Sequence, residues 1–293
     1  MTIQDALERA KQLRKTRERN PAAGAERSHV PLDDTGSLAI VRERIPVEAS
    51  VAVPQEKYRE LERVDMDLDD CGRRRVLLTD AQILMAGRAG AAYRLLRSRV
   101  LHRARTGNWS IVGVTSAEPG DGKTLTAVNL AISIAREKQR VVYLLDLDMR
   151  NPSVCETLGA RPPKALSEFF SADLAAEEVL FETAVENLVI AGNTEAVPNA
   201  SELLASPRLE ALLKYIRRRS PGALILIDLP PALSTDEALV VAPRVDAMFL
   251  VVSEGKTRRE AAMRAVNLLG DFKIAGIIVN RSREEVGGDY YTY

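Results

Sequence analysis

The sequence predicts an α/β fold with a mostly parallel, doubly wound sheet flanked by helices, a flexible N-terminal extension and a flexible C-terminal tail. Short apolar runs, of the kind found in strands that are buried on both faces, recur from residue 110 onwards. Helical stretches separate most of these runs, and strands that alternate with helices favour a parallel sheet. With 293 residues, 46% of them hydrophobic, the chain is long enough for one large domain and two extensions.

Residues 1–80 are expected to form an N-terminal region outside the main domain. Apolar residues in the segment 2–19 recur at helical spacing, among them Ile3, Leu7 and Leu13, and basic residues outnumber acidic ones there. The segment 20–55 contains Pro, Ala and Gly without clear periodicity, which indicates a linker. The segment 56–80 mixes charges with short apolar pieces and predicts no defined element. The sequence thus predicts a basic amphipathic helix followed by a linker.

Residues 81–282 are expected to form the main domain. The apolar runs predict strands at 110–115, 141–145, 188–191, 224–227, 248–252 and 274–279. The predicted helices cover 88–105, 123–137, 201–219, 235–244 and 257–271. The remaining residues, 283–293, form the expected tail: Gly287 and Gly288 favour flexibility, and three of the seven tyrosines of the chain follow as Tyr290, Tyr291 and Tyr293.

Residues 117–124 read Ala-Glu-Pro-Gly-Asp-Gly-Lys-Thr, the pattern of a phosphate-binding loop (Walker A) with Ala117 in place of the first glycine. The loop lies between a predicted strand and a predicted helix, which is the context that the motif requires. Glycines let backbone N–H groups approach phosphate oxygens, and the helix N-terminus adds its positive end. The residues expected to surround the nucleotide are Glu118, Pro119, Gly120, Asp121, Gly122, Lys123, Thr124 and Leu125.

Acidic residues follow two predicted strands at their carboxyl ends, the edge where open α/β sheets bind ligands. Asp146 and Asp148 follow the run 141–145, and Asp228 follows the run 224–227. We expect Lys123, Asp146, Asp148 and Asp228 to be catalytic and Thr124, Asp146 and Asp228 to bind Mg²⁺. Asp146 is the better candidate for a general base and Asp148 the weaker one. The alternative is that these acids cap or end elements.

Bulk composition narrows the possible partners and cellular locations of the protein. Lys plus Arg and Asp plus Glu number 41 each, so net charge gives no reason to expect nucleic acid as a partner. The two cysteines, Cys71 and Cys155, form no disulfide framework and suit a reducing cytoplasm. No apolar run reaches the roughly 18 residues expected of a membrane-spanning helix. Any association with a membrane is therefore expected to occur through a partner or a surface helix.

In their order along residues 88–293, these motifs resemble the bacterial tyrosine kinase family of P-loop NTPases. The resemblance comprises the loop 117–124, the Asp-x-Asp-x-Arg motif that ends at Arg150, the Walker B residue Asp228, and the tyrosine-rich tail. The segment 198–204 is also typical of the family. The resemblance implies that Mg-ATP drives transfer to Tyr290, Tyr291 and Tyr293 of a neighbouring subunit, in the regulation of surface polysaccharide synthesis and export. It also implies that Asn280 lies at the adenine.

The chain departs from related patterns at two positions. Partitioning and cell-division ATPases carry a lysine where this chain has Glu118. Many of the kinases carry Glu-x-x-Arg-x-x-Arg before the first strand, used in ring assembly, whereas Ala91 stands here in the glutamate position before Arg94 and Arg97. A homo-oligomer is therefore possible, but any ring is expected to be weak. The alternative for these arginines is a solvated helix face.

The resemblance also implies a partner, a membrane-embedded adaptor of the polysaccharide copolymerase type. The protein would then be cytoplasmic and peripheral at the inner face of the membrane, with the segment 2–19 as a possible docking helix. Two other functions stay open from sequence. One is a nucleotide-gated scaffold of the export machinery that transfers little phosphate. The other is an ATPase of the partitioning or MinD type.

Overall fold

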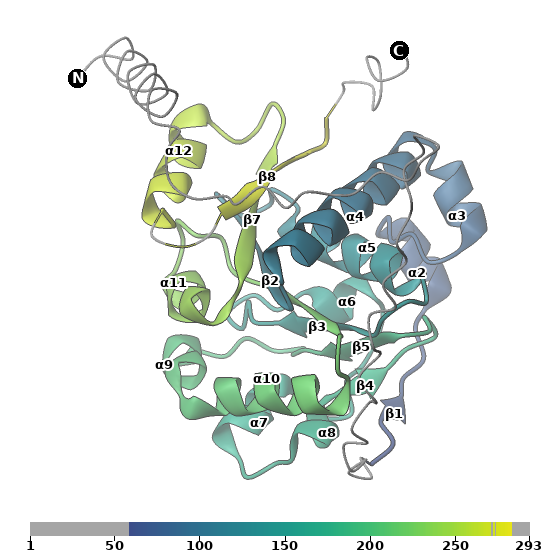
Figure 1. Ribbon diagram of the computed structural model, residues 1–293, viewed down its shortest axis with the longest axis vertical. Helices are drawn as coiled ribbons and strands as arrows, with labels where there is room; N and C mark the ends of the chain where they lie inside the picture. The colour runs from purple at the N-terminus through teal and green to yellow at the C-terminus, as the bar shows by residue number, and fades with distance from the viewer. Residues whose placement is uncertain (1–58, 271, 273, 283–293) are drawn as a thin grey trace, which may run out of the picture. The chain divides into compact units, whose positions relative to one another are not determined.

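An eight-stranded sheet lies at the centre of the computed structural model, which describes residues 59–270, 272 and 274–282. The strands follow the order β1-β4-β5-β3-β6-β2-β7-β8, and all neighbours are parallel except β4 and β5 (Figure 1). This arrangement confirms the predicted fold class. The strands are β1 (Glu62–Arg63), β2 (Ile111–Ser116), β3 (Val142–Asp146), β4 (Phe181–Glu182), β5 (Leu188–Ala191), β6 (Leu224–Asp228), β7 (Ala247–Ser253) and β8 (Ile274–Asn280).

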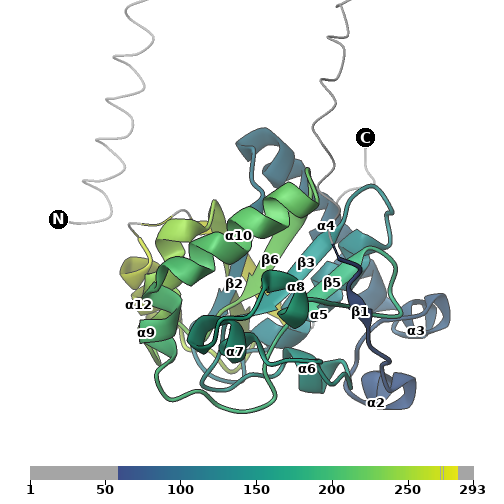
Figure 2. The same ribbon diagram turned by 90° about the horizontal axis from the view of Figure 1, so that it is seen from below.

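Helices cover both faces of the sheet (Figures 1 and 2). On one face pack α2 (Leu68–Arg73), α4 (Arg88–Gly107), α5 (Lys123–Ala135) and α6 (Val154–Thr157). On the other face pack α7 (Leu166–Ser171), α8 (Ala176–Val179), α9 (Ala200–Ala205), α10 (Pro207–Arg219), α11 (Glu237–Val241) and α12 (Arg259–Leu268). The helix α3 (Asp80–Met85) precedes α4, and a 3₁₀ turn, Ala242–Arg244, follows α11.

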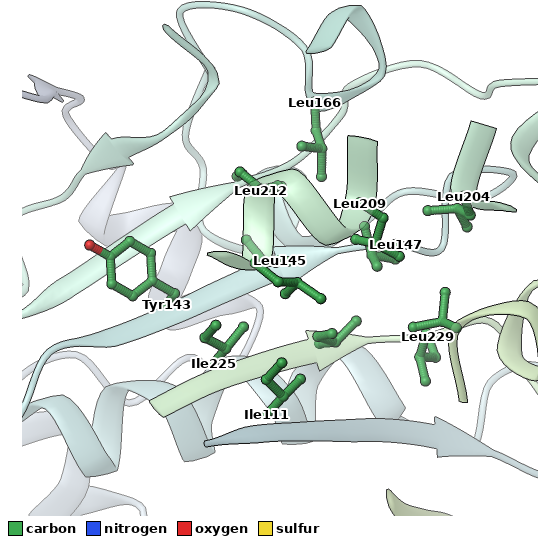
Figure 3. Close-up of a cluster of buried hydrophobic side chains, with 14 of the residues drawn as sticks. Ile111, Tyr143, Leu145, Leu147, Leu166, Leu204, Leu209, Leu212, Ile225 and Leu229 are labelled. Atoms are coloured by element: carbon green, nitrogen blue, oxygen red, sulfur yellow. The ribbon is translucent and has the colours of Figure 1, made fainter. Parts of the chain in front are cut away.

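The core consists of two layers because successive strand residues point to opposite faces. In β3, Tyr143 and Leu145 lie in the layer under α10, whereas Val142 and Leu144 lie in the layer under α5. Figure 3 shows the first layer, where leucines of α9 and α10 point toward the side chains of β3 and β6. Each fully buried leucine of this kind stabilises the fold by roughly 1.5–3 kcal/mol. The strands that end at the candidate site are thus held on both faces.

The six predicted strands are all present with ends within one residue of those expected. Two predicted helices are divided in the structure, and a proline marks each division. Pro207 starts α10 directly after Ser206, so the stretch 201–219 becomes α9 and α10. Pro243 lies in the 3₁₀ turn that ends the stretch 235–244. The strands β1 and β4 were not predicted, because two residues are too few to show a periodicity.

Residues 59–80 differ from the expectation of an N-terminal region that is separate up to residue 80. β1 pairs with β4, and Cys71, Val76 and Leu78 are buried in the same layer as α5. The described residues from 59 onwards accordingly belong to one compact unit. The sequence did not reveal this packing, because the buried apolar residues of the segment are spaced irregularly among charged ones. The predicted helix 2–19, the linker up to residue 55 and the tail 283–293 lie outside the described residues.

Because the central strands are parallel, their carboxyl ends meet at one edge of the sheet. Ser116, Asp146, Asp228, Ser253 and Asn280 are the last residues of β2, β3, β6, β7 and β8. This edge therefore gathers polar side chains from five strands. In the part of the chain that the structure describes, no helix combines the length and the apolar character needed to cross a bilayer.

Asn129 tests whether residues 59–80 belong to the domain. Its Oδ1 accepts the Leu77 N–H at 2.8 Å, and its Nδ2 donates to the Arg75 carbonyl at 3.1 Å. Asn129→Ala leaves both backbone groups unpaired and should lower the free energy of unfolding by about 2 kcal/mol. Denaturant unfolding measures this loss, and limited proteolysis should then cut within 59–80. Asn267→Ala, at an exposed position of α12, is the matched control and should change neither result.

Candidate functional site

The segment between β2 and α5 forms a tight loop that opens on the helix N-terminus. Gly120 and Gly122 adopt φ values of 77° and 92°, in the left-handed region that favours glycine. α5 starts at Lys123 and runs for 13 residues, with no side chain capping its first turn. The backbone N–H groups of this turn, together with the positive end of the helix, form a cradle for an anion.

Close packing around the loop explains why glycine is required at residue 122. A Cβ atom there would lie 2.1 Å from Nδ2 of Asn280. That Nδ2 donates a hydrogen bond to the Asp121 carbonyl at 2.8 Å, and the Asn280 Oδ1 accepts the Arg281 N–H. Asn280 therefore contacts the loop, and both ends of its amide are engaged. Its predicted place at an adenine stays a prediction.

Lys123 lies at the centre of a buried cluster of charged groups. Its Nζ is 2.7 Å from Oδ2 of Asp148 and 3.2 Å from Oδ2 of Asp228, and the three side chains are 10%, 3% and 0% exposed. The same Nζ lies 3.0 Å from Oγ1 of Thr124. The structure thus brings together the lysine of the loop and acids from two different strands.

Thr124 connects this cluster to the loop 147–153, which follows β3. Its hydroxyl donates to Asp228 Oδ2 at 2.6 Å and lies 3.0 Å from Oγ of Ser153. The other oxygen of the Asp228 carboxylate, Oδ1, is buried and has no hydrogen-bond partner among the described residues. A buried carboxylate oxygen without a partner is costly, so this atom indicates a place for a ligand that the protein itself does not supply.

Asp146 occupies a different environment from Asp148 and Asp228. Its Oδ2 accepts the N–H groups of Ser153 and Val154, both at 2.9 Å, and its Oδ1 accepts the Asp148 N–H at 3.2 Å. The carboxylate therefore holds the loop 147–153 against the end of β3. Asp146 therefore caps the start of α6 and also lies beside the charged cluster.

Burial and mutual repulsion shift the pKa values of these groups. Burial, and next the charge of Asp228, raise the pKa of Asp146 to about 8, against the opposing effect of the Val154 N–H. Burial also raises the pKa of Asp228, although Lys123 counteracts the rise. For Lys123, burial alone would lower the pKa, but Asp228 and Asp148 outweigh it, so the pKa is raised and the ammonium stays charged.

The donor set fits a nucleotide phosphate and Mg²⁺. The loop N–H groups and Lys123 suit phosphate oxygens, and the unpartnered Asp228 oxygen beside the Thr124 hydroxyl suits a hard cation. Within the described residues, no three His, Cys, Asp or Glu side chains could hold a metal ion by themselves. Mg²⁺ usually binds one or two carboxylates together with substrate phosphates and water.

The other residues predicted to surround the nucleotide make contacts outside the charged cluster. Asp121 is fully buried, and its Oδ2 accepts the Glu118 N–H at 3.0 Å. The Pro119 carbonyl accepts a hydrogen bond from Lys256 at 2.8 Å. Leu125 is partly buried and packs against the layer under α4 and α5. Tyr290, Tyr291 and Tyr293 lie outside the described residues, so their role stays a prediction.

Sequence reasoning missed residues that reach the loop from elsewhere, above all Lys256 and Thr257 in the turn after β7. The sequence could have indicated them, because they closely follow a strand that ends at the same edge of the sheet as the phosphate loop. It also missed Glu237, whose buried carboxylate pairs with Arg150 of the Asp-x-Asp-x-Arg motif. Arg97 pairs with Glu137 at 2.8 Å within the chain, whereas Arg94 is exposed on α4.

Comparisons with known proteins agree with this geometry. A family model described as ParA, NUBPL iron-transfer P-loop NTPase, matches residues 109–286, which is more than half of the chain. The tyrosine-protein kinase CpsD of Streptococcus pneumoniae is 30% identical over 156 residues, 53% of this chain and 67% of that protein. The tyrosine-protein kinase YwqD of Bacillus subtilis (strain 168) is 28% identical over 203 residues, 69% of this chain and 84% of that protein.

Solved structures give the same result. The kinase domain of the Escherichia coli tyrosine kinase ETK is 26% identical and superposes with a TM-score of 0.60. The match covers 69% of this chain and 78% of that one.

Gly122→Ala tests the cradle. The added methyl group would collide with the Asn280 amide at a backbone conformation that is unfavourable for alanine, so the affinity for Mg-ATP should fall by roughly tenfold or more. Isothermal titration calorimetry measures this. Gly87→Ala is the matched control, because Gly87 also has a positive φ, of 48°, but nothing lies within 4 Å of its added Cβ. Equal affinities of the two variants would contradict the prediction.

Amide substitution should change the stability of the protein differently at Asp228 and at Asp146. Asp228→Asn removes a crowded buried charge while keeping an oxygen for Thr124, so the apo protein should melt at the same or a higher temperature and yet lose phosphoryl transfer. Asp146→Asn places an NH₂ group against backbone N–H donors, so both activity and stability should fall, the latter by about 1–3 kcal/mol. Calorimetric melting of both variants without nucleotide checks this difference, and an equal loss of stability in the two would contradict it.

Proposed function

Since the chain belongs to the ParA family of P-loop NTPases and, within it, to the bacterial tyrosine kinases, we propose that it uses Mg-ATP to phosphorylate the tyrosine cluster at its own C-terminus. The observation that carries the proposal is the convergence of Lys123, Thr124 and Asp228 at the mouth of the glycine loop, with one carboxylate oxygen unpartnered. A site of this kind supplies positioning and charge, which are what phosphoryl transfer requires of a protein.

Phosphate binding is assigned to the loop and to Lys123. The N–H groups of Gly120 to Lys123 hold phosphate oxygens at the N-terminus of α5. In the described structure, Lys123 pairs with Asp148 and Asp228. On nucleotide binding, its ammonium turns from these carboxylates to the β- and γ-phosphate oxygens and neutralises the charge on the transferred group.

Thr124 and Asp228 would hold Mg²⁺, with Asp146 as a further candidate. When bound, Mg²⁺ neutralises negative charge on the β- and γ-phosphates. Asp228 supports this role because no described residue is a hydrogen-bond partner of its Oδ1, while Oδ2 is fixed by the Thr124 hydroxyl.

Asp146 is our candidate for the group that accepts the proton of the tyrosine hydroxyl. Burial raises the pKa of Asp146 to about 8, so its deprotonated form is a stronger base than a solvated carboxylate, and this pKa lies closer to that of the tyrosine hydroxyl, which is near 10. Two N–H groups fix Oδ2, whereas Oδ1 carries a single contact at 3.2 Å and keeps a lone pair for a proton. Asp148, paired with Lys123, is the weaker candidate.

The last strand ends at the edge of the sheet where the site lies. β8 ends at Asn280, whose side chain contacts the phosphate loop. The ten residues from Arg281 to Tyr290 span at most about 33 Å when extended. This reach allows transfer within a chain or to a neighbour, and resemblance to the family favours a neighbour.

We place this activity at the inner face of the cytoplasmic membrane, in the control of surface polysaccharide synthesis and export. The partner would be a membrane-embedded adaptor of the copolymerase type. The pairing of Arg97 with Glu137 inside the chain supports weak self-assembly in the absence of that adaptor.

Replacement of Tyr290, Tyr291 and Tyr293 with Phe tests the proposal. The triple variant should lose most of the phosphate that the wild-type protein incorporates from Mg-ATP, because the acceptors are gone, while its affinity for Mg-ATP stays unchanged. Intact-mass spectrometry counts the phosphates. Lys123→Met is the second arm, and it should lower the rate of incorporation by roughly 100-fold or more, as expected for removing a charge that stabilises the transition state.

The same measurement separates the alternatives. Phosphotyrosine that maps mainly to residues before the tail in the triple variant would contradict the tail as substrate. Release of free phosphate without protein modification would favour an ATPase of the partitioning type. Nucleotide binding without either reaction would favour a scaffold.

A further inference from the structure

A buried carboxylate lies inside the phosphate loop, where a negative charge is unfavourable. Asp121 is between Gly120 and Gly122, both of which have positive φ, and it is 0% exposed. If its side chain turned toward the bound phosphates, it would repel them, because like charges that are partly shielded from water interact strongly. Something must therefore hold this carboxylate away from the ligand.

The turn after β7 holds the Asp121 carboxylate. The Thr257 hydroxyl donates to Asp121 Oδ1 at 2.7 Å, and the Glu118 N–H donates to Oδ2 at 3.0 Å. Thr257 Oγ1 also accepts the Ser253 N–H at 2.8 Å, which fixes the direction of its single proton toward Asp121. The carboxylate is thus satisfied from outside the loop.

Lys256 makes a second contact from the same turn. Its Nζ donates to the Pro119 carbonyl at 2.8 Å and lies 2.5 Å from the position that a Cβ of residue 120 would take. The contacts of Lys256 and Thr257 therefore bracket Gly120 on its two sides. Two glycines make the loop flexible in isolation, because glycine loses more conformational freedom on ordering than any other residue.

We propose that Lys256 and Thr257 are positioning residues for nucleotide binding: they hold the loop 118–122 in its anion-binding conformation and keep the Asp121 carboxylate turned away from the phosphates. This inference rests on the proposed use of ATP. Lys256 and Thr257 contact the loop at Pro119 and Asp121, so we expect their effect to fall on affinity for the nucleotide rather than on the chemical step.

Thr257→Val, which keeps the shape of the side chain and removes its hydroxyl, tests the proposal in the full chain. The Kd for Mg-ATP, measured by calorimetry, should rise about tenfold, the effect of losing one hydrogen bond to a charged group. The KM for ATP in tail phosphorylation should rise similarly, with kcat nearly unchanged. Thr257→Ser retains the hydroxyl and should restore the wild-type Kd. Lys256→Met should raise Kd several-fold.

Asp121→Asn distinguishes positioning from mere packing. If Thr257 restrains a charge, Thr257→Val should raise Kd much less in the Asp121→Asn background than in the wild type, since the repulsive carboxylate is gone. Equal effects in both backgrounds, or an unchanged Kd in the Thr257→Val protein, would overturn the proposal. Thr106→Val and Lys214→Met, on exposed faces of α4 and α10, are matched controls and should leave Kd unchanged.

The readout by Kd separates this inference from the proposed kinase activity. A wild-type protein that binds Mg-ATP but transfers no phosphate to its tail would refute the proposed function and leave the positioning role to be decided by Kd. A wild-type protein that does not bind Mg-ATP would refute both.

Discussion

The ammonium group of Lys123 lies between the carboxylates of Asp148 and Asp228 in the interior of the protein, and the candidate site depends on this arrangement. Three acids within one buried cluster repel each other, and burial penalises each charge. Lys123 offsets part of this cost, and the Thr124 hydroxyl and backbone N–H groups offset more. One Asp228 oxygen has no hydrogen-bond partner in the part of the chain that the structure describes. The cluster is thus incomplete in a way that a phosphate-bound cation would complete.

The parallel sheet makes this cluster possible. Asp146 and Asp228 are direct register partners at the ends of β3 and β6, so the two carboxylates are neighbours although 82 residues separate them along the chain. β2, on the other side of β6, delivers the phosphate loop to the same edge. The apolar layers on both faces of these strands hold the three strand ends rigidly, which a site based on electrostatic positioning needs.

The loop itself is held by its surroundings and not only by its own sequence. Asn280, Lys256 and Thr257 contact it from the ends of β8 and β7. Asn280 is also the last residue of β8, so the end of this strand contacts the phosphate loop directly.

The sequence alone determined the fold class, the six main strands and the residues of the loop, because buried parallel strands and a phosphate loop both leave strong local patterns. It also indicated Asp146, Asp148 and Asp228 through their positions after apolar runs. Only the tertiary structure decided what each acid contacts: Asp146 binds backbone N–H groups, Asp148 binds Lys123, and Asp228 binds Thr124. It also decided that residues 59–80 pack into the domain, with β1 paired to β4, and that the Thr257 hydroxyl binds Asp121 across 136 residues. Such partners are set by strand order and packing, which join distant segments and leave no periodicity in either one.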